Sequence, residues 1–241
     1  MTQRRLAELD CHIEQEDAAP RLAVVLCHGY GAPATDLVPI GAELRRTDSN
    51  IRDHARFYFP AAPLDLAPQG MPGGRAWWPI NMEQLVRVSE SGRWEDVRQA
   101  MPEGLFDASE KLLATCRAIQ AETGLPWSRI VLGGFSQGAM LATDVALSLP
   151  EPTAGLIIAS GTLLAEQDWS RKARELSELR IIQGHGDADP ILPFAGAEAL
   201  RAMLTEAGHD VEFLPFHGGH TIATSLLVAM ARRLAELVAE D

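Results

Sequence analysis

Cysteine is scarce in this sequence. It has only Cys11, Cys27 and Cys116, and none of these belongs to a Cys-x-x-Cys pair. An odd number of widely spaced cysteines argues against a disulfide framework and against a zinc site built on thiolates. Because such usage is typical of a reducing compartment, we expect a cytoplasmic protein.

Long apolar segments are also missing. No run of about 18 apolar residues occurs, which is the length that a membrane-spanning helix needs. Residues 1–5 lead into mixed polar sequence rather than the apolar centre of a signal peptide. We therefore expect neither export nor stable membrane insertion.

Basic residues are outnumbered by acidic ones. The 21 lysines and arginines face 33 aspartates and glutamates, so the formal net charge is −12. Because a phosphate backbone would be repelled by this charge, nucleic acid is excluded as a partner. Hydrophobic residues make up 46% of the chain, which is enough for a sizeable core. No linker rich in Pro, Gly or Ser divides the sequence, so we expect a single domain over residues 1–241.

Short β-branched runs alternate with amphipathic stretches of helical length, a pattern typical of βα units in a mostly parallel sheet with helices on both faces. The predicted strands are Leu22–Cys27, Phe57–Phe59, Ile130–Leu132, Gly155–Ala159, Arg180–Gln183 and Val211–Pro215, with Leu6–Ile13 as a weaker edge strand. The predicted helices are Thr35–Thr47, Gly104–Thr123, Gln137–Leu149, Phe194–Ala207 and Thr221–Ala239.

The segment 66–102 interrupts this alternation. It combines turn residues with Trp77, Trp78 and methionines and shows no clear period. Long irregular insertions are often functional, so one interpretation is a lid or substrate-facing insertion in which Trp77 and Trp78 contact the substrate. The alternative is a surface loop that the two tryptophans anchor to the core.

The sequence Gly-Phe-Ser-Gln-Gly at residues 134–138 follows an apolar strand and precedes a helix-forming run. In this setting a serine lies on a sharp, strained turn, and flanking glycines avoid collisions with the neighbouring strand and helix. We therefore predict Ser136 as a nucleophile. The first N–H of the following helix, that of Gln137, would stabilise an oxyanion.

A serine nucleophile needs a histidine base and an acid that orients it, and in α/β-hydrolases both follow the serine in the chain. Asp187 and Asp189 compete for the acid, with a weak preference for Asp189 because it precedes Pro190. His217 and His220 compete for the base. We favour His220, which lies directly before the last predicted helix.

A second oxyanion donor should follow an earlier strand. The turn His28-Gly29-Tyr30-Gly31 has this position, which makes the Tyr30 N–H the candidate. Because His28 precedes Ser136 in the chain, we interpret it as a buried histidine that braces the turn.

Four segments together resemble the phospholipase/carboxylesterase family of α/β-hydrolases, which includes the acyl-protein thioesterases. They are LCHGYGAPATDLVPI at 26–40, GFSQGAM at 134–140, GHGDADPILP at 184–193 and HGGHTI at 217–222. The resemblance implies an α/β-hydrolase fold, the triad Ser136, Asp189 and His220, and oxyanion donors at Tyr30 and Gln137. It also implies hydrolysis of small-molecule or lipid acyl esters without a cofactor. The chain departs from the family pattern over 77–102, where a longer insertion follows the aromatic pair.

Two other functions are compatible with the residues. His185, Asp187, Asp189, His217 and His220 offer ligand types that zinc or manganese uses, as in a metal-dependent hydrolase. The same fold could also serve as a small-molecule receptor without catalysis. The sequence leaves the oligomeric state open, a homodimer included.

Overall fold

The computed structural model describes residues 1–14, 19–80 and 98–240. Its centre is an eight-stranded sheet in the order β1-β2-β4-β3-β7-β8-β9-β10. The strands are β1 (Thr2–Leu6), β2 (Leu9–Glu14), β3 (Leu22–Cys27), β4 (Ala55–Pro60), β7 (Ile130–Phe135), β8 (Gly155–Ala159), β9 (Arg180–Gly186) and β10 (Asp210–Phe216). From β4 to β10 every neighbouring pair is parallel, whereas β1 and β2 add an antiparallel edge. The predicted mostly parallel sheet is confirmed.

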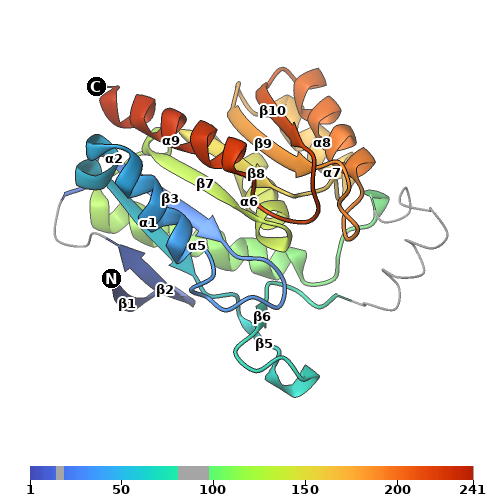
Figure 1. Ribbon diagram of the computed structural model, residues 1–241, viewed down its shortest axis with the longest axis horizontal. Helices are drawn as coiled ribbons and strands as arrows, with labels where there is room; N and C mark the ends of the chain where they lie inside the picture. The colour runs from blue at the N-terminus through green and yellow to red at the C-terminus, as the bar shows by residue number, and fades with distance from the viewer. Residues whose placement is uncertain (15–18, 81–97, 241) are drawn as a thin grey trace.

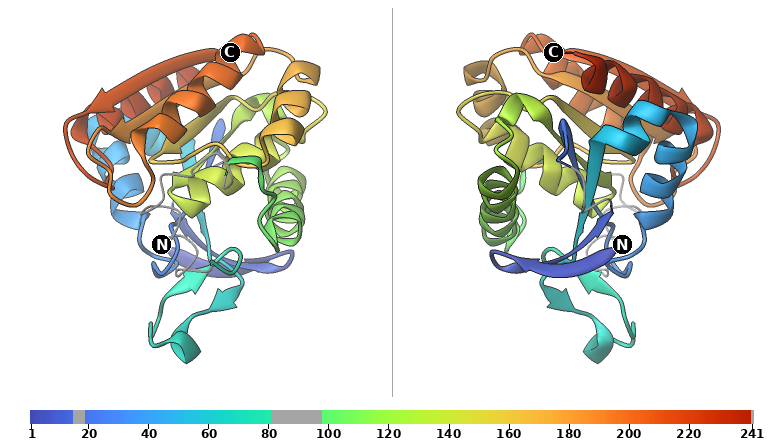
Figure 2. Two further views of the ribbon diagram at one scale, coloured as in Figure 1. Left: turned by 90° about the vertical axis from the view of Figure 1, so that its right-hand side faces the viewer. Right: turned by 90° about the vertical axis from the view of Figure 1, so that its left-hand side faces the viewer.

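Helices cover both faces of this sheet (Figures 1 and 2). They are α1 (Val38–Thr47), α2 (Ser49–His54), α5 (Leu105–Thr123), α6 (Gln137–Leu147), α7 (Glu166–Glu175), α8 (Phe194–Glu206) and α9 (Thr224–Ala239). Buried residues of α1, α2 and α9 form one hydrophobic cluster with the sheet, and those of α5, α6, α7 and α8 form the other. Two separate apolar layers therefore enclose the sheet.

The strand β3 shows how the sequence produces these layers. Leu22, Val24 and Leu26 face the cluster of α1, α2 and α9, while the residues between them, Ala23 and Val25, face the opposite cluster. Successive side chains of a strand point to opposite faces of the sheet. A continuous apolar run is therefore required where both faces are covered.

Some element boundaries differ from the sequence-based prediction. The weak edge strand 6–13 is a hairpin, in which β1 pairs with β2 across a turn where Ala7 has a φ of 50°. The helices α2 and α7 were not predicted. The last helix begins at Thr224 rather than at Thr221. Consequently the loop that carries His220 is three residues longer than expected.

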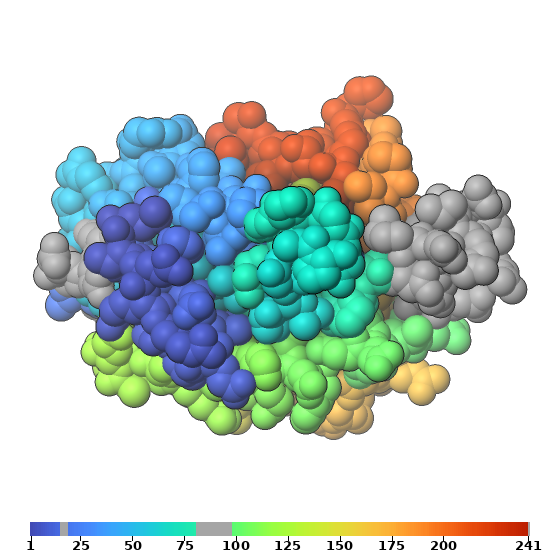
Figure 3. Space-filling view, turned by 90° about the horizontal axis from the view of Figure 1, so that it is seen from below, coloured from blue at the N-terminus to red at the C-terminus, as the bar shows by residue number. Residues whose placement is uncertain are grey.

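The first part of segment 66–102 carries its own small structure. A two-stranded antiparallel sheet joins β5 (Leu64–Asp65) to β6 (Arg75–Ala76), and the 3-10 helix η1 (Ala67–Gln69) lies between them. A second 3-10 helix, η2 (Trp127–Arg129), precedes β7. Viewed from below, the teal β5–β6 segment forms a raised mass beside the dark-blue β1–β2 hairpin (Figure 3). Residues 81–97 of the predicted lid lie outside the described residues.

Within the described ranges, none of the helices combines the length and the apolar character that crossing a membrane requires.

Candidate active site

Ser136 lies on the sharp turn between β7 and α6. Its φ of 54° and ψ of −117° are unfavourable for a residue with a side chain. The turn is held in place because the Ser136 N–H donates to the Ala159 carbonyl at 2.9 Å. A Cβ at Gly134 would lie 2.5 Å, and one at Gly138 2.1 Å, from the Cys27 carbonyl oxygen. The two glycines thus allow the turn to pass directly against β3.

Asp189 and His220 lie in the loops after β9 and β10, which are neighbouring parallel strands. The His220 Nδ1–H donates to Asp189 Oδ2 at 2.6 Å, and the two side chains are 11% and 0% exposed. The other carboxylate oxygen accepts the N–H groups of Ile191 and Leu192 at 2.8 and 3.0 Å. Burial by itself raises the pKa of the Asp189 carboxyl, but these hydrogen bonds hold it below its ordinary value. Asp189 is therefore a buried carboxylate that fixes the His220 ring.

The competing residues Asp187 and His217 form a second pair on the same two loops. The His217 Nδ1 lies 3.2 Å from Asp187 Oδ2, and the Gly218 N–H donates to Asp187 Oδ1 at 3.2 Å. The side chain of His217 is 94% exposed and that of Asp187 is 47% exposed. This pair joins the two loops at the surface, away from the buried Asp189 and His220.

The loop of His220 also approaches the nucleophile turn. The His220 ring centroid lies 4.8 Å from that of Phe135, the residue before Ser136. The Ser160 hydroxyl, at the end of β8, donates to the Thr221 carbonyl at 3.0 Å. Among the described residues, Ser136 Oγ and His220 are not joined by a hydrogen bond. Catalytic contacts are often longer in the unliganded enzyme and tighten with substrate.

The two predicted oxyanion donors belong to the two turns that meet at Ser136. Gln137 is the first residue of α6, so its N–H has no acceptor one turn earlier in the helix. Tyr30 follows β3, and a Cβ at the adjacent Gly29 would lie 3.4 Å from Ser136 Cβ. Within the ranges that the structure describes, the Tyr30 N–H donates to no other protein group. Both N–H groups are therefore available near Ser136.

His28 is buried and uses both of its ring nitrogens. Its Nδ1–H donates to the Gly29 carbonyl at 2.8 Å, and its Nε2 accepts the Ala62 N–H at 3.1 Å. Burial lowers the pKa of His28, so the ring is neutral at pH 7. This geometry agrees with a histidine that braces the turn.

His185 was considered above only as a metal ligand, yet it contacts Asp189. Its side chain is 0% exposed, and its Nε2 lies 2.8 Å from the Leu192 carbonyl and 3.3 Å from Asp189 Oδ2. Because both contacts are acceptors, Nε2 carries the proton. Burial lowers the pKa of His185, which keeps the ring neutral. The sequence signal that could have indicated this contact is the short spacing within His-Gly-Asp-Ala-Asp.

Trp77 and Trp78 are 2% and 3% exposed and belong to a hydrophobic cluster. The Trp77 indole N–H donates to the His28 carbonyl at 2.9 Å. Both tryptophans are thus anchored to the core, and few of their atoms are open to a substrate. Contact of either residue with a substrate stays a prediction.

The proposed metal ligands do not gather around one point. In residues 1–14, 19–80 and 98–240, no group of three or more His, Cys, Asp or Glu side chains is placed to hold a metal ion. The five candidates instead form the Asp187–His217 and Asp189–His220 pairs, with His185 beside Asp189.

A mostly parallel sheet of this topology, with a serine on the strand–helix turn and a His–Asp pair after later strands, defines an α/β-hydrolase. The family model for Phospholipase/Carboxylesterase matches residues 9–237. The chain belongs to this family, as its motifs predicted, which makes it an ester hydrolase of the serine type.

Individual relatives agree with this assignment. Acyl-protein thioesterase 1 from Eremothecium gossypii is 28% identical over 216 residues, covering 86% of this chain and 84% of the relative. The corresponding Neurospora crassa protein is also 28% identical, covering 88% and 85%. Among solved structures, esterase PE8 has a TM-score of 0.80 at 30% identity and covers 95% of this chain and 99% of its own. The carboxylesterase of Bacillus cereus, at 16% identity and a TM-score of 0.68, shares the fold over 96% of this chain and 95% of its own.

Proposed function

We propose that the protein hydrolyses carboxylic esters and thioesters through an acyl-enzyme on Ser136, with His220 as general base and Asp189 as the orienting acid. The observation that carries the proposal is the 2.6 Å hydrogen bond between His220 and the buried Asp189, in loops at the same end of the parallel sheet as the strained Ser136 turn. Because Asp189 accepts the Nδ1 proton, the Nε2 lone pair of His220 is available to take a proton from the serine.

In the first step Ser136 Oγ attacks the acyl carbonyl and its proton passes to His220 Nε2. The carbonyl oxygen becomes an oxyanion, which the N–H groups of Tyr30 and Gln137 stabilise. The tetrahedral adduct collapses, and His220 delivers the proton to the departing alcohol or thiol. A water molecule, deprotonated by His220, then attacks the acyl-enzyme. The second tetrahedral adduct expels Ser136 Oγ, which takes the proton back from His220, and the carboxylic acid is released.

The names of the relatives indicate which acyl donors to test. Two are called acyl-protein thioesterase 1 and one is called an esterase. We therefore propose S-acyl thioesters and simple acyl esters as substrates, with Trp77 and Trp78 predicted to contact the acyl group. A cytoplasmic location and a homodimer stay predictions. Cell fractionation tests the first, and analytical ultracentrifugation tests the second.

The test compares two serines at opposite ends of α6. Ser136→Ala removes the nucleophile, and we expect kcat for p-nitrophenyl esters and acyl thioesters to fall by at least about 10⁴-fold. Ser148→Ala removes a hydroxyl that donates to the Asp144 carbonyl at 2.7 Å and leaves kcat unchanged. A fluorophosphonate labels the wild type and Ser148→Ala but not Ser136→Ala. Full turnover by Ser136→Ala would overturn the mechanism.

A further inference from the structure

The segment Arg75–Trp78, which comprises β6 and the two residues after it, runs past both candidate oxyanion donors. We call this segment the brace. Its first contacts are with the turn that carries Tyr30. The Gly31 N–H donates to the Arg75 carbonyl at 2.9 Å, and the Arg75 N–H donates to the Ala32 carbonyl at 3.1 Å. The two residues after Tyr30 are thereby paired with the brace as if they were a short strand.

The other end of the brace is bonded to Gln137, the residue after the nucleophile. The Trp77 N–H donates to Gln137 Oε1 at 2.9 Å, and Gln137 Nε2 donates to the Trp78 carbonyl at 2.9 Å. The Gln137 side chain is fully buried. The oxygen and the nitrogen of its side-chain amide are therefore both hydrogen-bonded to consecutive residues of the brace, while its backbone N–H stays available beside Ser136.

A third contact holds the brace against the residue that directly follows β3. The Trp77 indole N–H donates to the carbonyl of His28, two residues before Tyr30, and the two rings lie 5.5 Å apart. The Arg75 side chain donates to the carbonyls of Ala62 and Pro63 in the chain that leads into the β5–β6 hairpin. The brace is thus fixed to the sheet as well as to both donor turns.

We infer that the brace sets the spacing of the two oxyanion donors, so that the Gln137 side chain and Trp77 are positioning residues of the active site. The contacts with the donor turns are made to groups beside the donors: the backbone of Gly31 and Ala32 on one side, the side-chain amide of Gln137 on the other. The brace therefore holds the two turns together without occupying either donor. Donors fixed in advance where charge develops lower the barrier most, and a misplacement of about 1 Å can cost about 100-fold in rate. The inference rests on the proposed function.

The main test is Gln137→Met. Methionine has nearly the same length and volume but cannot bond to Trp77 or Trp78, and the backbone N–H of residue 137 is retained. We expect kcat to fall by about 10- to 100-fold while KM changes little, because the oxyanion forms only in the transition state. The affinity for a trifluoromethyl ketone, which forms an oxyanion adduct on Ser136, should fall by the same factor as kcat.

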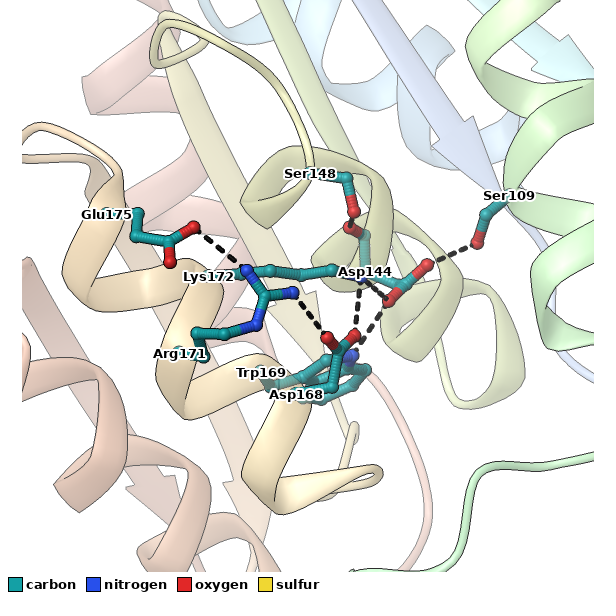
Figure 4. Close-up of polar contacts among 8 residues, drawn as sticks. All are labelled: Ser109, Asp144, Ser148, Asp168, Trp169, Arg171, Lys172 and Glu175. Atoms are coloured by element: carbon teal, nitrogen blue, oxygen red, sulfur yellow. Dashed lines mark hydrogen bonds and ion pairs between the residues drawn. The ribbon is translucent and has the colours of Figure 1, made fainter.

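Trp77→Phe gives a second test with a matched control. It removes the indole N–H bond to His28 together with part of the buried ring, and we expect a smaller fall in both kcat and ketone affinity. In Trp169→Phe an indole N–H bond of the same length, 2.9 Å, is lost from a tryptophan that is also buried. This bond goes to Asp144 on α6, in a network that also includes Ser109 of α5 and Lys172 of α7 (Figure 4). Trp169→Phe should lower the melting temperature but leave kcat and ketone affinity unchanged.

The outcomes separate the brace from the catalytic mechanism. If folded Gln137→Met and Trp77→Phe keep the wild-type kcat and ketone affinity, the brace has no positioning role, although Ser136→Ala can still be inactive. An equal loss of kcat in Trp169→Phe would show that general destabilisation explains the effect. Should Gln137→Met fail to fold, the comparison of Trp77→Phe with Trp169→Phe decides alone. If the wild type hydrolyses no ester or thioester, the proposed function fails first.

Discussion

Acidification should destabilise the protein through three buried histidines. His28, His185 and His209 are 1%, 0% and 5% exposed. For each of them, burial lowers the pKa below that of a solvated imidazole. The native state therefore keeps these rings neutral at a pH where the unfolded chain has begun to take up protons.

The sign and size follow from this difference in proton uptake. A pKa that is lowered in the folded state leaves stability complete above the unfolded value of about 6.5, and stability declines as the pH falls from there towards the native pKa. Between pH 7.5 and 5.5 each imidazole that stays neutral in the folded state lowers the free energy of unfolding by up to about 1.4 kcal/mol. The three together lower it by up to about 4 kcal/mol. This is a large fraction of a typical unfolding free energy of about 5–15 kcal/mol. Glu14 stabilises the folded state as the pH falls, because burial raises the pKa of its carboxyl. The loss of about 4 kcal/mol from the three histidines is therefore an upper limit.

Urea titrations at pH 7.5, 6.5 and 5.5, followed by tryptophan fluorescence, measure this loss. His209→Gln removes one buried imidazole at the start of β10 and should reduce the difference between pH 7.5 and 5.5 by up to about 1.4 kcal/mol. His217→Gln, which removes a 94% exposed side chain, should keep the full difference. The reasoning is refuted if the unfolding free energy is the same at both pH values, or if His209→Gln and His217→Gln behave alike.

Two further substitution pairs test the site. Asp189→Asn should lower kcat by about 10⁴-fold because the His220 tautomer is no longer held. Asp187→Asn breaks only a solvent-exposed pair and should lower kcat by less than about tenfold. Steady-state kinetics compare the two variants, and equal losses would contradict the assignment of the acid. Gly138→Ala places a Cβ 2.1 Å from the Cys27 carbonyl oxygen and should yield little folded protein, whereas at Gly155 the nearest atom would lie 3.5 Å from the new Cβ and alanine should be tolerated. Thermal melts compare the two variants, and a wild-type melting temperature for Gly138→Ala would refute the steric argument.

Much of the fold was predictable because apolar periodicity reports directly on burial. The runs at β3 and β8 are fully buried and were predicted with their observed bounds. In contrast, α7 has only Trp169 and Ala173 buried within ten mostly charged or polar residues, so it had too few apolar residues to be predicted as a core-facing helix. The six residues of α2 are too few to show a period at all.

The sequence by itself determined the nucleophile turn and the order of the three candidate catalytic residues. A serine between two glycines after a buried strand is a local pattern, and local patterns are visible in one dimension. Local patterns left Asp187 and His217 as alternatives, and the resemblance to the family favoured Asp189 and His220. Only the tertiary structure shows that Asp189 and His220 form the buried pair and Asp187 and His217 the exposed one, because burial depends on contacts between segments far apart in the chain. The brace was invisible for the same reason. It joins Trp77 to Gln137 across 60 residues through hydrogen bonds of one side-chain amide, and such contacts leave no period or spacing in the chain.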